Sequence, residues 1–328
     1  MQAPIWLKIL YFHLLVMTPT QQKGLVIRST GSWYDVRQED GSMISCRLRG
    51  KFKIHGLKVT NPIAVGDSVF YHVEDETENR GMITEIAPRT NYILRKSVHK
   101  TAHGHILAAN LDQAILLVTL TFPRTSLGFI DRFLVSAESF RIPTRIVFNK
   151  IDLMPEEALE YQQELAELYE PLGYPCHFIS ALTGAGVEEL QQQLENKISL
   201  IAGHSGVGKS TFINAIAPGF NLRTSEVSTF ANKGVHTTTF AEMFELPKNT
   251  FLIDSPGIKE LGIMDIETGE LNHYFPEFAE LLNTCKYHNC RHINEPQCRV
   301  KEGIENGTIA ESRYLSYLSI LEDQDNRR

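Results

Sequence analysis

The sequence predicts three domains in series: a small β-barrel of the OB type, a doubly wound α/β domain and a small, mostly helical module. Three observations predict this order. Short strand candidates separated by turn signals fill residues 24–89. Strands and helices alternate from residue 111, and three cysteines and one histidine cluster between residues 285 and 298. A chain of 328 residues is long enough for two or three domains.

The composition is that of a globular protein with unevenly distributed charge. Hydrophobic residues make up 42% of the chain, and the net charge of −7 argues against attraction of the whole surface to nucleic acid. Nine glutamates and no lysine or arginine lie in residues 155–196, which we interpret as the solvated face of two helices. The clustered cysteines fit a reduced, cytoplasmic compartment and a metal site better than disulfides.

The first 17 residues are apolar and resemble the hydrophobic part of a signal peptide. Only Lys8 supplies positive charge there, no small-residue cleavage site follows, and the run is shorter than the ~20 residues of a membrane span. We therefore treat residues 1–23 as an extension whose role the sequence does not assign. We expect either a natural start at Met17 or a non-functional extension, and no membrane association.

Residues 24–89 are predicted to form an OB-type barrel of five short strands. The strands are expected at 24–29, 33–38, 42–48, 67–73 and 81–86. A stretch without acidic residues carries Arg47, Arg49, Lys51 and Lys53, with an aromatic residue among them. Basic groups with interleaved aromatics on such a barrel suit contact with RNA. The alternative is an edge strand that lysine and arginine protect from pairing.

Residues 90–110 hold basic residues and histidines without cysteine or carboxylate partners, and we expect a linker there. The alternation from 111 to 262 predicts a doubly wound α/β domain, followed by the third module at 263–328. Strands are expected at 114–120, 144–148, 175–179, 198–202, 238–246 and 250–254, and helices at 129–140, 155–169, 187–197 and 210–217.

The α/β domain is organised around Gly203–Ser210, whose sequence GHSGVGKS fits G-x-x-x-x-G-K-[ST]. Its glycines let backbone N–H groups turn inward to cradle phosphate oxygens, and the following helix directs its N-terminal dipole at the anion. Lys209 is expected to reach the β- and γ-phosphates, and Ser210 to bind Mg²⁺. The predicted nucleotide contacts in this loop are Gly203, His204, Ser205, Gly206, Val207, Gly208, Lys209, Ser210 and Thr211.

Base recognition is predicted from the sequence NKID, which directly follows a strand of the domain. Asp152 can accept hydrogen bonds from guanine N1–H and the exocyclic amine, a donor pair that adenine lacks. Asn149 can bond near N7, and the Lys150 stem can pack over the purine. Ser180 and Ala181 end the next strand and can present backbone N–H groups to guanine O6. These pairings favour GTP over ATP; the alternative for Asp152 is an N-cap of the following helix.

Two segments after the phosphate loop are candidate switches. GVHTTT contains Thr238, with Thr237 as its substitute, and this threonine is expected to bind Mg²⁺ when the γ-phosphate is present. DSPG follows the strand at 250–254. Asp254 is therefore expected in the Mg²⁺ shell, and the Gly257 N–H at the γ-phosphate.

The sequence leaves open what orients the attacking water. Ile258 follows DSPG where many GTPases place a glutamine, and isoleucine cannot orient water by hydrogen bonding. We expect slow intrinsic hydrolysis, with a partner or another residue completing the site. His236 is the candidate for that residue, and the alternative is a switch residue that contacts RNA or solvent.

A metal site is predicted from the pattern C-x₄-C-x-H-x₅-C, formed by Cys285, Cys290, His292 and Cys298. Three thiolates and one imidazole suit a closed, tetrahedral, structural Zn²⁺ site, with His288 as a competing ligand. Helices are expected at 270–282, interrupted by a proline, and at 309–321. Arg291 and Arg299 flank the cluster and are candidates for RNA contact.

The order of the nucleotide motifs is unusual. GTPases of the common type present the phosphate loop, switch threonine, DxxG, NKxD and SA in that order, whereas here NKID and SA precede the phosphate loop. Permutation is tolerated because the termini of a compact domain often lie close together. With the OB-like start and the cysteine cluster, this series resembles the RsgA (YjeQ) family of circularly permuted GTPases over roughly residues 24–320.

The resemblance implies an enzyme that hydrolyses GTP to GDP and phosphate. It also implies stimulation by the small ribosomal subunit and action late in the assembly of that subunit, with ribosomal RNA as a partner. A second class of function is a GTP-dependent signalling switch that works through protein partners without RNA. The pairing of an OB-like barrel and its basic residues with a metal module favours RNA. A third, a structural RNA-binding protein with a relic phosphate loop, is disfavoured because Lys209, Ser210, Asp254 and Asp152 are intact. We expect a cytoplasmic monomer.

Overall fold

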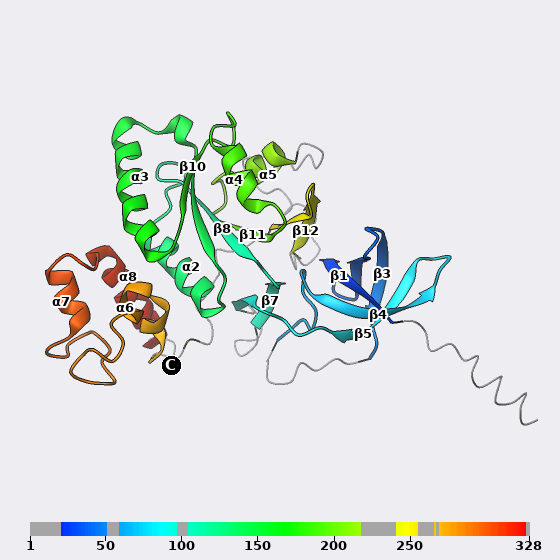
Figure 1. Cartoon of the computed structure of the whole chain (residues 1–328), viewed down its shortest axis with the longest axis horizontal. Helices are drawn as coiled ribbons and strands as arrows, with labels where there is room; N and C mark the ends of the chain where they lie inside the picture. The colour runs from blue at the N-terminus through cyan, green and yellow to red at the C-terminus, as the bar shows by residue number, and fades with distance from the viewer. Residues whose placement is uncertain are drawn as a thin grey trace, which may run out of the picture.

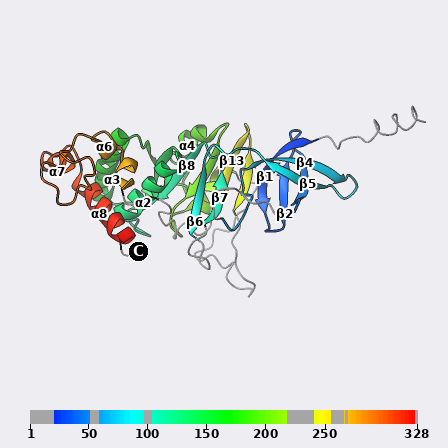
Figure 2. The same ribbon diagram turned by 90° about the horizontal axis from the view of Figure 1, so that it is seen from below.

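The computed structural model of the chain describes residues 21–50, 59–96, 104–217, 241–254, 266 and 269–325. Figure 1 shows three parts in a row: the N-terminal barrel in blue, the α/β domain in green, and the C-terminal module in orange and red. The turned view in Figure 2 shows the same row. Among these described ranges, no helix is both long and apolar enough to cross a membrane.

The barrel forms because its strands alternate buried and exposed side chains, as in β2, where Tyr34 and Val36 are buried and their neighbours are partly exposed. The strands are β1 (Gln22–Ser29), β2 (Trp33–Arg37), β3 (Met43–Leu48), β4 (Ser68–Asp75) and β5 (Arg80–Ile86). They pair in the order β1-β2-β3-β5-β4, and β4 pairs back to β1. The predicted closed five-stranded barrel is confirmed.

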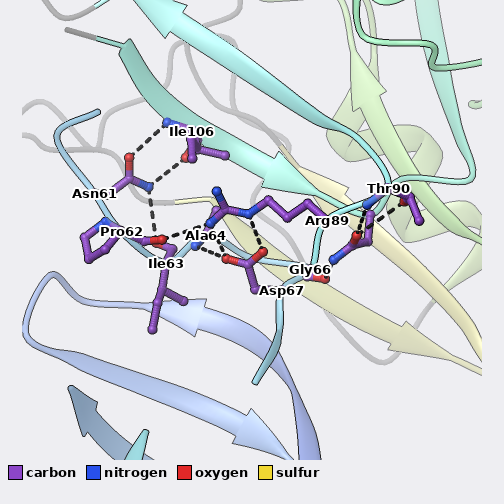
Figure 3. Close-up of polar contacts among 10 residues, drawn as sticks. Asn61, Pro62, Ile63, Ala64, Gly66, Asp67, Arg89, Thr90 and Ile106 are labelled. Carbon is purple, nitrogen blue, oxygen red and sulfur yellow. Dashed lines mark hydrogen bonds and ion pairs between the residues drawn. The ribbon is translucent and has the colours of Figure 1, made fainter. Parts of the chain in front are cut away.

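Two segments of residues 90–110, expected to be a linker, are strands, and residues 97–103 lie outside the described residues. β6 (Tyr92–Lys96) and β7 (Gly104–Ala109) pair as an antiparallel two-stranded sheet. The linker interpretation rested on the basic residues and histidines, but the apolar residues between them decide the structure, since Ile93 and Ile106 are almost completely buried. The Asn61 amide accepts from Ile106 N–H at 2.9 Å and donates to Ile106 O at 2.9 Å (Figure 3).

A buried ion pair fixes the start of this hairpin to the barrel. Arg89 forms two bonds of 2.7 Å with the carboxylate of Asp67, and the same guanidinium donates to Pro62 O at 2.9 Å (Figure 3). The Asp67 carboxylate also accepts from Ala64 N–H at 2.8 Å. Because its oxygens are hydrogen-bonded, the buried charge is compensated.

The central domain is a mainly parallel sheet with helices on both faces, in the strand order β10-β9-β8-β11-β13-β12. β8 is buried along its whole length, as its continuous apolar sequence predicts. The elements are β8 (Gln113–Val118), α2 (Leu127–Ser139), β9 (Thr144–Asn149), η1 (Ile151–Leu153), α3 (Glu156–Tyr169), η2 (Glu170–Leu172), β10 (Cys176–Ile179), α4 (Val187–Leu194), β11 (Ile198–Ala202), α5 (Lys209–Ile216), β12 (Glu242–Leu246) and β13 (Thr250–Asp254).

The barrel joins this sheet at its β12 edge. Arg28 of β1 pairs with Glu242 of β12, so the two parts share one eleven-stranded sheet. Arg37 of β2 forms a two-pronged ion pair with Glu245 of β12, with N–O distances of 2.7 and 2.6 Å. The barrel therefore contacts the strand that directly precedes β13, whose end carries Asp254.

The C-terminal module consists of η5 (Leu271–Tyr274), α6 (Pro276–Ala279), α7 (Arg299–Glu305) and α8 (Glu311–Asp325). The helix expected at 270–282 is broken into η5 and α6, because Phe275 is extended and Pro276 has no N–H to continue the helix. The module packs against α2 through α8 and η5, and Val135 of α2 belongs to its aromatic core.

Candidate functional site

The phosphate loop connects β11 to α5 and has a backbone that only glycine adopts easily. Gly203, Gly206 and Gly208 have φ values of 141°, 83° and 99°. A Cβ atom on Gly203 would lie 2.3 Å from Leu117 O, and one on Gly208 would lie 2.3 Å from Asn149 Nδ2. The glycines of the motif are therefore required by local backbone conformation and close packing, ahead of any contact with a ligand.

Lys209 lies at the first position of α5 and reaches back over the loop. Its Nζ donates to the carbonyl oxygens of Gly203 and His204, both at 2.8 Å. The ammonium is thus held at the loop that would cradle phosphate. An anion there would meet this charge and the N-terminal end of α5 together.

Asn149 joins the phosphate loop to the two loops that follow β9 and β10. Its Nδ2 donates to Val207 O at 2.8 Å, and its Oδ1 accepts from Ala181 N–H at 2.9 Å. The side chain is almost completely buried. Each amide atom keeps a second hydrogen-bonding position, so the expected bond near N7 of the purine stays a prediction. Asn149 therefore organises the site.

The other residues expected at the base also make contacts within the protein. Lys150 donates from Nζ to Phe122 O at 2.8 Å, so its side chain holds the loop after β8. The N–H groups of Ser180 and Ala181, expected to face guanine O6, are donated to Ala185 O and to Asn149 Oδ1. The two backbone N–H groups expected to bind guanine therefore donate to other groups of the protein.

Asp152 has the exposure that a ligand-binding carboxylate needs. It lies in η1 and is exposed, and η1 ends before α3 begins. The N-cap of α3 is Pro155, so the alternative in which Asp152 caps that helix is wrong. The carboxylate remains available for a ligand at this edge of the sheet.

Asp254 ends β13 beside Ile201 of β11, the strand that enters the phosphate loop. Burial raises the pKa of its carboxyl group, while the nearby charge of Lys209 lowers it. Its Oδ1 atom is buried and has no hydrogen-bond partner within the described part of the chain. A buried carboxylate oxygen without a partner fits a position for a divalent cation, because the cation would compensate the charge.

Several predicted residues lie outside the described residues: Lys51, Lys53, His236, Thr237, Thr238 and Gly257. The first two belong to the predicted RNA contact of the barrel. The others belong to the two candidate switches. The described part of the nucleotide site therefore consists of residues 203–211, the loops after β8, β9 and β10, and Asp254.

The predicted metal ligands do come together. The ligand atoms of Cys285, Cys290, His292 and Cys298 all lie within 4.8 Å of one another, and His288 is outside this group. His292 Nδ1 lies 3.3 Å from Cys298 Sγ and 3.8 Å from Cys285 Sγ. Three thiols and an imidazole at such distances fit a structural Zn²⁺ ion.

The surroundings of this cluster also suit a metal. Burial raises the pKa of the Cys290 thiol and lowers the pKa of His292, so burial opposes thiolate formation and favours the neutral imidazole that binds metal. A cation would stabilise the buried thiolates. Asn272 Nδ2 lies 3.4 Å from His292 Nε2, and Arg299 N–H donates to Cys285 Sγ at 3.3 Å, which orients two of the ligands.

Comparison with known proteins decides the family. Residues 86–264, more than half of the chain, match the family described as RsgA GTPase, and residues 23–83 match the RsgA N-terminal domain. The chain belongs to the RsgA GTPase family. It is 55% identical over 306 residues to the "Small ribosomal subunit biogenesis GTPase RsgA" of Cytophaga hutchinsonii, covering 93% of this chain and 100% of that protein. It is 50% identical over 303 residues to the protein of that name in Bacteroides fragilis, covering 92% and 97%.

Two solved structures are similar over more than nine-tenths of this chain. YjeQ from Thermotoga maritima has a TM-score of 0.77 and 40% identity, covering 94% of this chain and 100% of that one. YloQ, described as a circularly permuted GTPase, has a TM-score of 0.73 and 28% identity, covering 95% and 98%. The chain is thus a GTP hydrolase with a circularly permuted nucleotide domain, as its motif order predicted.

Three side chains around the nucleotide site were not predicted from the sequence. Phe122 and Leu182 are 82% and 76% exposed, on the loops after β8 and β10. Phe129 of α2 contacts the ring of His204 in the phosphate loop, with ring centroids 3.8 Å apart. The sequence does show an aromatic residue, Phe122, in the loop between a predicted strand and a predicted helix. The contact between the Phe129 and His204 rings depends on packing between distant segments, which the sequence does not show.

The described RNA candidates differ in how well they are placed for a partner. Arg49 is exposed, and Arg47 lies 3.2 Å from the Glu74 carboxylate, which offsets part of its charge. In the C-terminal module Arg299 is exposed but pairs with Glu302 at 2.6 Å. Arg291 is partly buried, and its backbone N–H donates to Glu295 at 2.7 Å.

Proposed function

We propose that this GTPase is stimulated by the small ribosomal subunit and acts late in the assembly of that subunit, in the cytoplasm and as a monomer. The main support is the identity of 50 to 55% to proteins named for small-subunit biogenesis, which extends over more than nine-tenths of the chain. The order of domains agrees, since a nucleotide site lies between an OB barrel and a cysteine module. These are two surfaces of types that bind RNA.

We assign the phosphate-binding role to residues 203–211 and the guanine-binding role to Asp152. Lys209 would exchange the carbonyl oxygens it now contacts for the β- and γ-phosphates of GTP. Asp152 would select guanine through its N1–H and amine. Lys150 would lie at the base while it holds Phe122 O.

Mg²⁺ would be held by Ser210 and Asp254, with Thr238 added in the triphosphate state. The buried Asp254 Oδ1 supports this assignment, because the cation would provide its missing partner. Bound Mg²⁺ neutralises charge that develops on the phosphates. His236 remains the candidate for orienting water, since isoleucine follows DSPG.

Zinc would be held by the three cysteines and His292 as a structural ion. All four ligand positions come from the protein, which leaves no open position for a substrate. The module would then present Arg291 and Arg299 to ribosomal RNA. On the barrel, Arg47, Arg49, Lys51 and Lys53 would do the same.

GTP turnover with and without purified small subunits tests the proposal. We expect slow hydrolysis alone and a large stimulation by the subunits, with no stimulation by large subunits. Lys209→Ala should abolish both rates, because the β- and γ-phosphates lose their cation. Retained turnover would mean either that another protein in the sample hydrolyses GTP or that the phosphate site is misassigned. Absence of stimulation by small subunits would contradict the proposal and favour a switch that acts through protein partners.

A further inference from the structure

Helix α2 contacts the phosphate loop and the C-terminal module with two different sides. Near its start, the Phe129 ring lies 3.8 Å from the His204 ring, with an angle of 30° between the planes. Two residues later, Asp131 accepts from Nη1 of Arg313 in α8 at 2.7 Å. Successive helical residues are about 100° apart around the axis, so positions 129 and 131 point in nearly opposite directions. Figure 2 shows α2 beside α8.

The side of α2 that faces the C-terminal module is tightly fixed. Arg313 and Asp131 are 1% and 0% exposed, and Arg313 also forms two bonds with Glu277 of α6, at 2.7 and 3.1 Å. Tyr169 of α3 donates from its hydroxyl to Asp131 at 2.8 Å. Val135, one turn further along α2, packs into the core of the module. A displacement of α2 would therefore be transmitted to α6 and α8.

The other side of α2 meets a residue that nucleotide binding would disturb. Lys209 Nζ donates to the carbonyl oxygen of His204. Phosphate oxygens that bind to this ammonium would compete with the His204 carbonyl for its three N–H donors, which changes the surroundings of the His204 backbone. The ring of His204 lies against Phe129, so a change of the loop reaches α2 directly. The variable position inside the phosphate motif thereby acquires a role.

We propose that the contact between His204 and Phe129 passes the nucleotide state of the phosphate loop to the C-terminal module through α2, with the Asp131–Arg313 bridge at the far end. His204 and Phe129 are positioning residues in this scheme. The route uses neither GVHTTT nor DSPG, and it rests on the proposed role of residues 203–210 in binding phosphate. The route requires that nucleotide binding at the phosphate loop be energetically coupled to the C-terminal module, and this coupling can be measured.

Hydrogen exchange of the full chain, without nucleotide and with saturating GDP, tests this route. We expect GDP to change the exchange of amides in α8 by about fivefold, the lower end of usual coupling between sites. Phe129→Leu keeps an apolar side chain but removes the ring, and should abolish the change in α8 while the variant still binds GDP.

Phe140→Leu is the matched control, because Phe140 caps the other end of α2 and pairs with the Tyr92 ring, 5.1 Å between centroids. It should leave the effect of GDP on α8 intact. A full effect of GDP in Phe129→Leu would overturn the proposal, and so would the absence of an effect in the unmodified protein that binds GDP. Failure to bind GDP would instead contradict the nucleotide role of residues 203–210. Fluorescent GDP titration distinguishes the two failures.

Discussion

Replacement of Arg313 by methionine would remove the only cation that the described structure places between Asp131 and Glu277. The guanidinium is 1% exposed and joins two carboxylates that are 0% and 8% exposed. The variant would leave two buried acids unpaired. Breaking a buried pair in this way costs about 3–5 kcal/mol of unfolding free energy. By comparison, Arg299 and Glu302 form a pair that is more than half exposed, and Arg299→Met should cost less than about 1 kcal/mol.

Urea denaturation with a tryptophan-independent probe, such as circular dichroism, would measure both variants at pH 7.5 and pH 5.5. Burial raises the pKa of Asp131, and in the unmodified protein Arg313 opposes that rise. Without Arg313 the folded-state pKa lies further above the unfolded value. Protonation of Asp131 at lower pH therefore favours the folded state of the variant. The loss of unfolding free energy in Arg313→Met should shrink at pH 5.5.

Two results would refute this reasoning about Arg313. One is a loss of unfolding free energy in Arg313→Met no larger than in Arg299→Met. The other is a deficit that grows toward pH 5.5, because unpaired carboxylates must lose their penalty when they are protonated. Asp131→Asn combined with Arg313→Met should recover part of the loss, since one of the two unpaired charges is removed.

Three further predictions concern the ligand sites. Asp152→Asn should weaken GTP binding by about 100-fold or more, because two hydrogen bonds to a charged acceptor are lost. The variant should instead favour xanthosine triphosphate, whose 2-oxo group accepts a hydrogen bond from an amide. Unchanged base preference in competitive titrations would exclude Asp152 from base recognition. Asp254→Asn should raise the melting temperature of the nucleotide-free protein at pH 7.5, because burial raises the pKa of the native carboxyl and penalises its charge. This gain in melting temperature should fade as the pH falls through that pKa, and equal melting temperatures of the two proteins at every pH would contradict the expectation. In the same variant, magnesium-dependent GTP affinity should drop about tenfold or more. Cys298→Ser should reduce zinc from one ion per chain and destabilise the C-terminal module, whereas Cys176→Ser, outside the cluster, should keep the metal; elemental analysis and thermal melting measure both.

Local patterns predicted the parts of this protein that depend on residues close together in the chain. The strands of the barrel, the buried strand at β8 and the glycine-rich loop follow from alternation, apolar runs and backbone freedom. The four metal ligands lie within 14 positions, and they converge as their spacing predicts. Local composition misled at 90–110, where the basic residues hid two strands, whereas the interruption predicted at Pro276 is present.

The sequence by itself determined the chemical identity of the site: a phosphate loop, an aspartate suited to guanine, a permuted motif order and a four-ligand cluster. Only the tertiary structure decided how these parts are held together. Asn149 bonds to Val207 and Ala181, and Asp131 meets Arg313 across 182 positions of the chain. No local pattern encodes such partners, because a buried amide or charge takes whichever complementary group the packed core brings within hydrogen-bond distance.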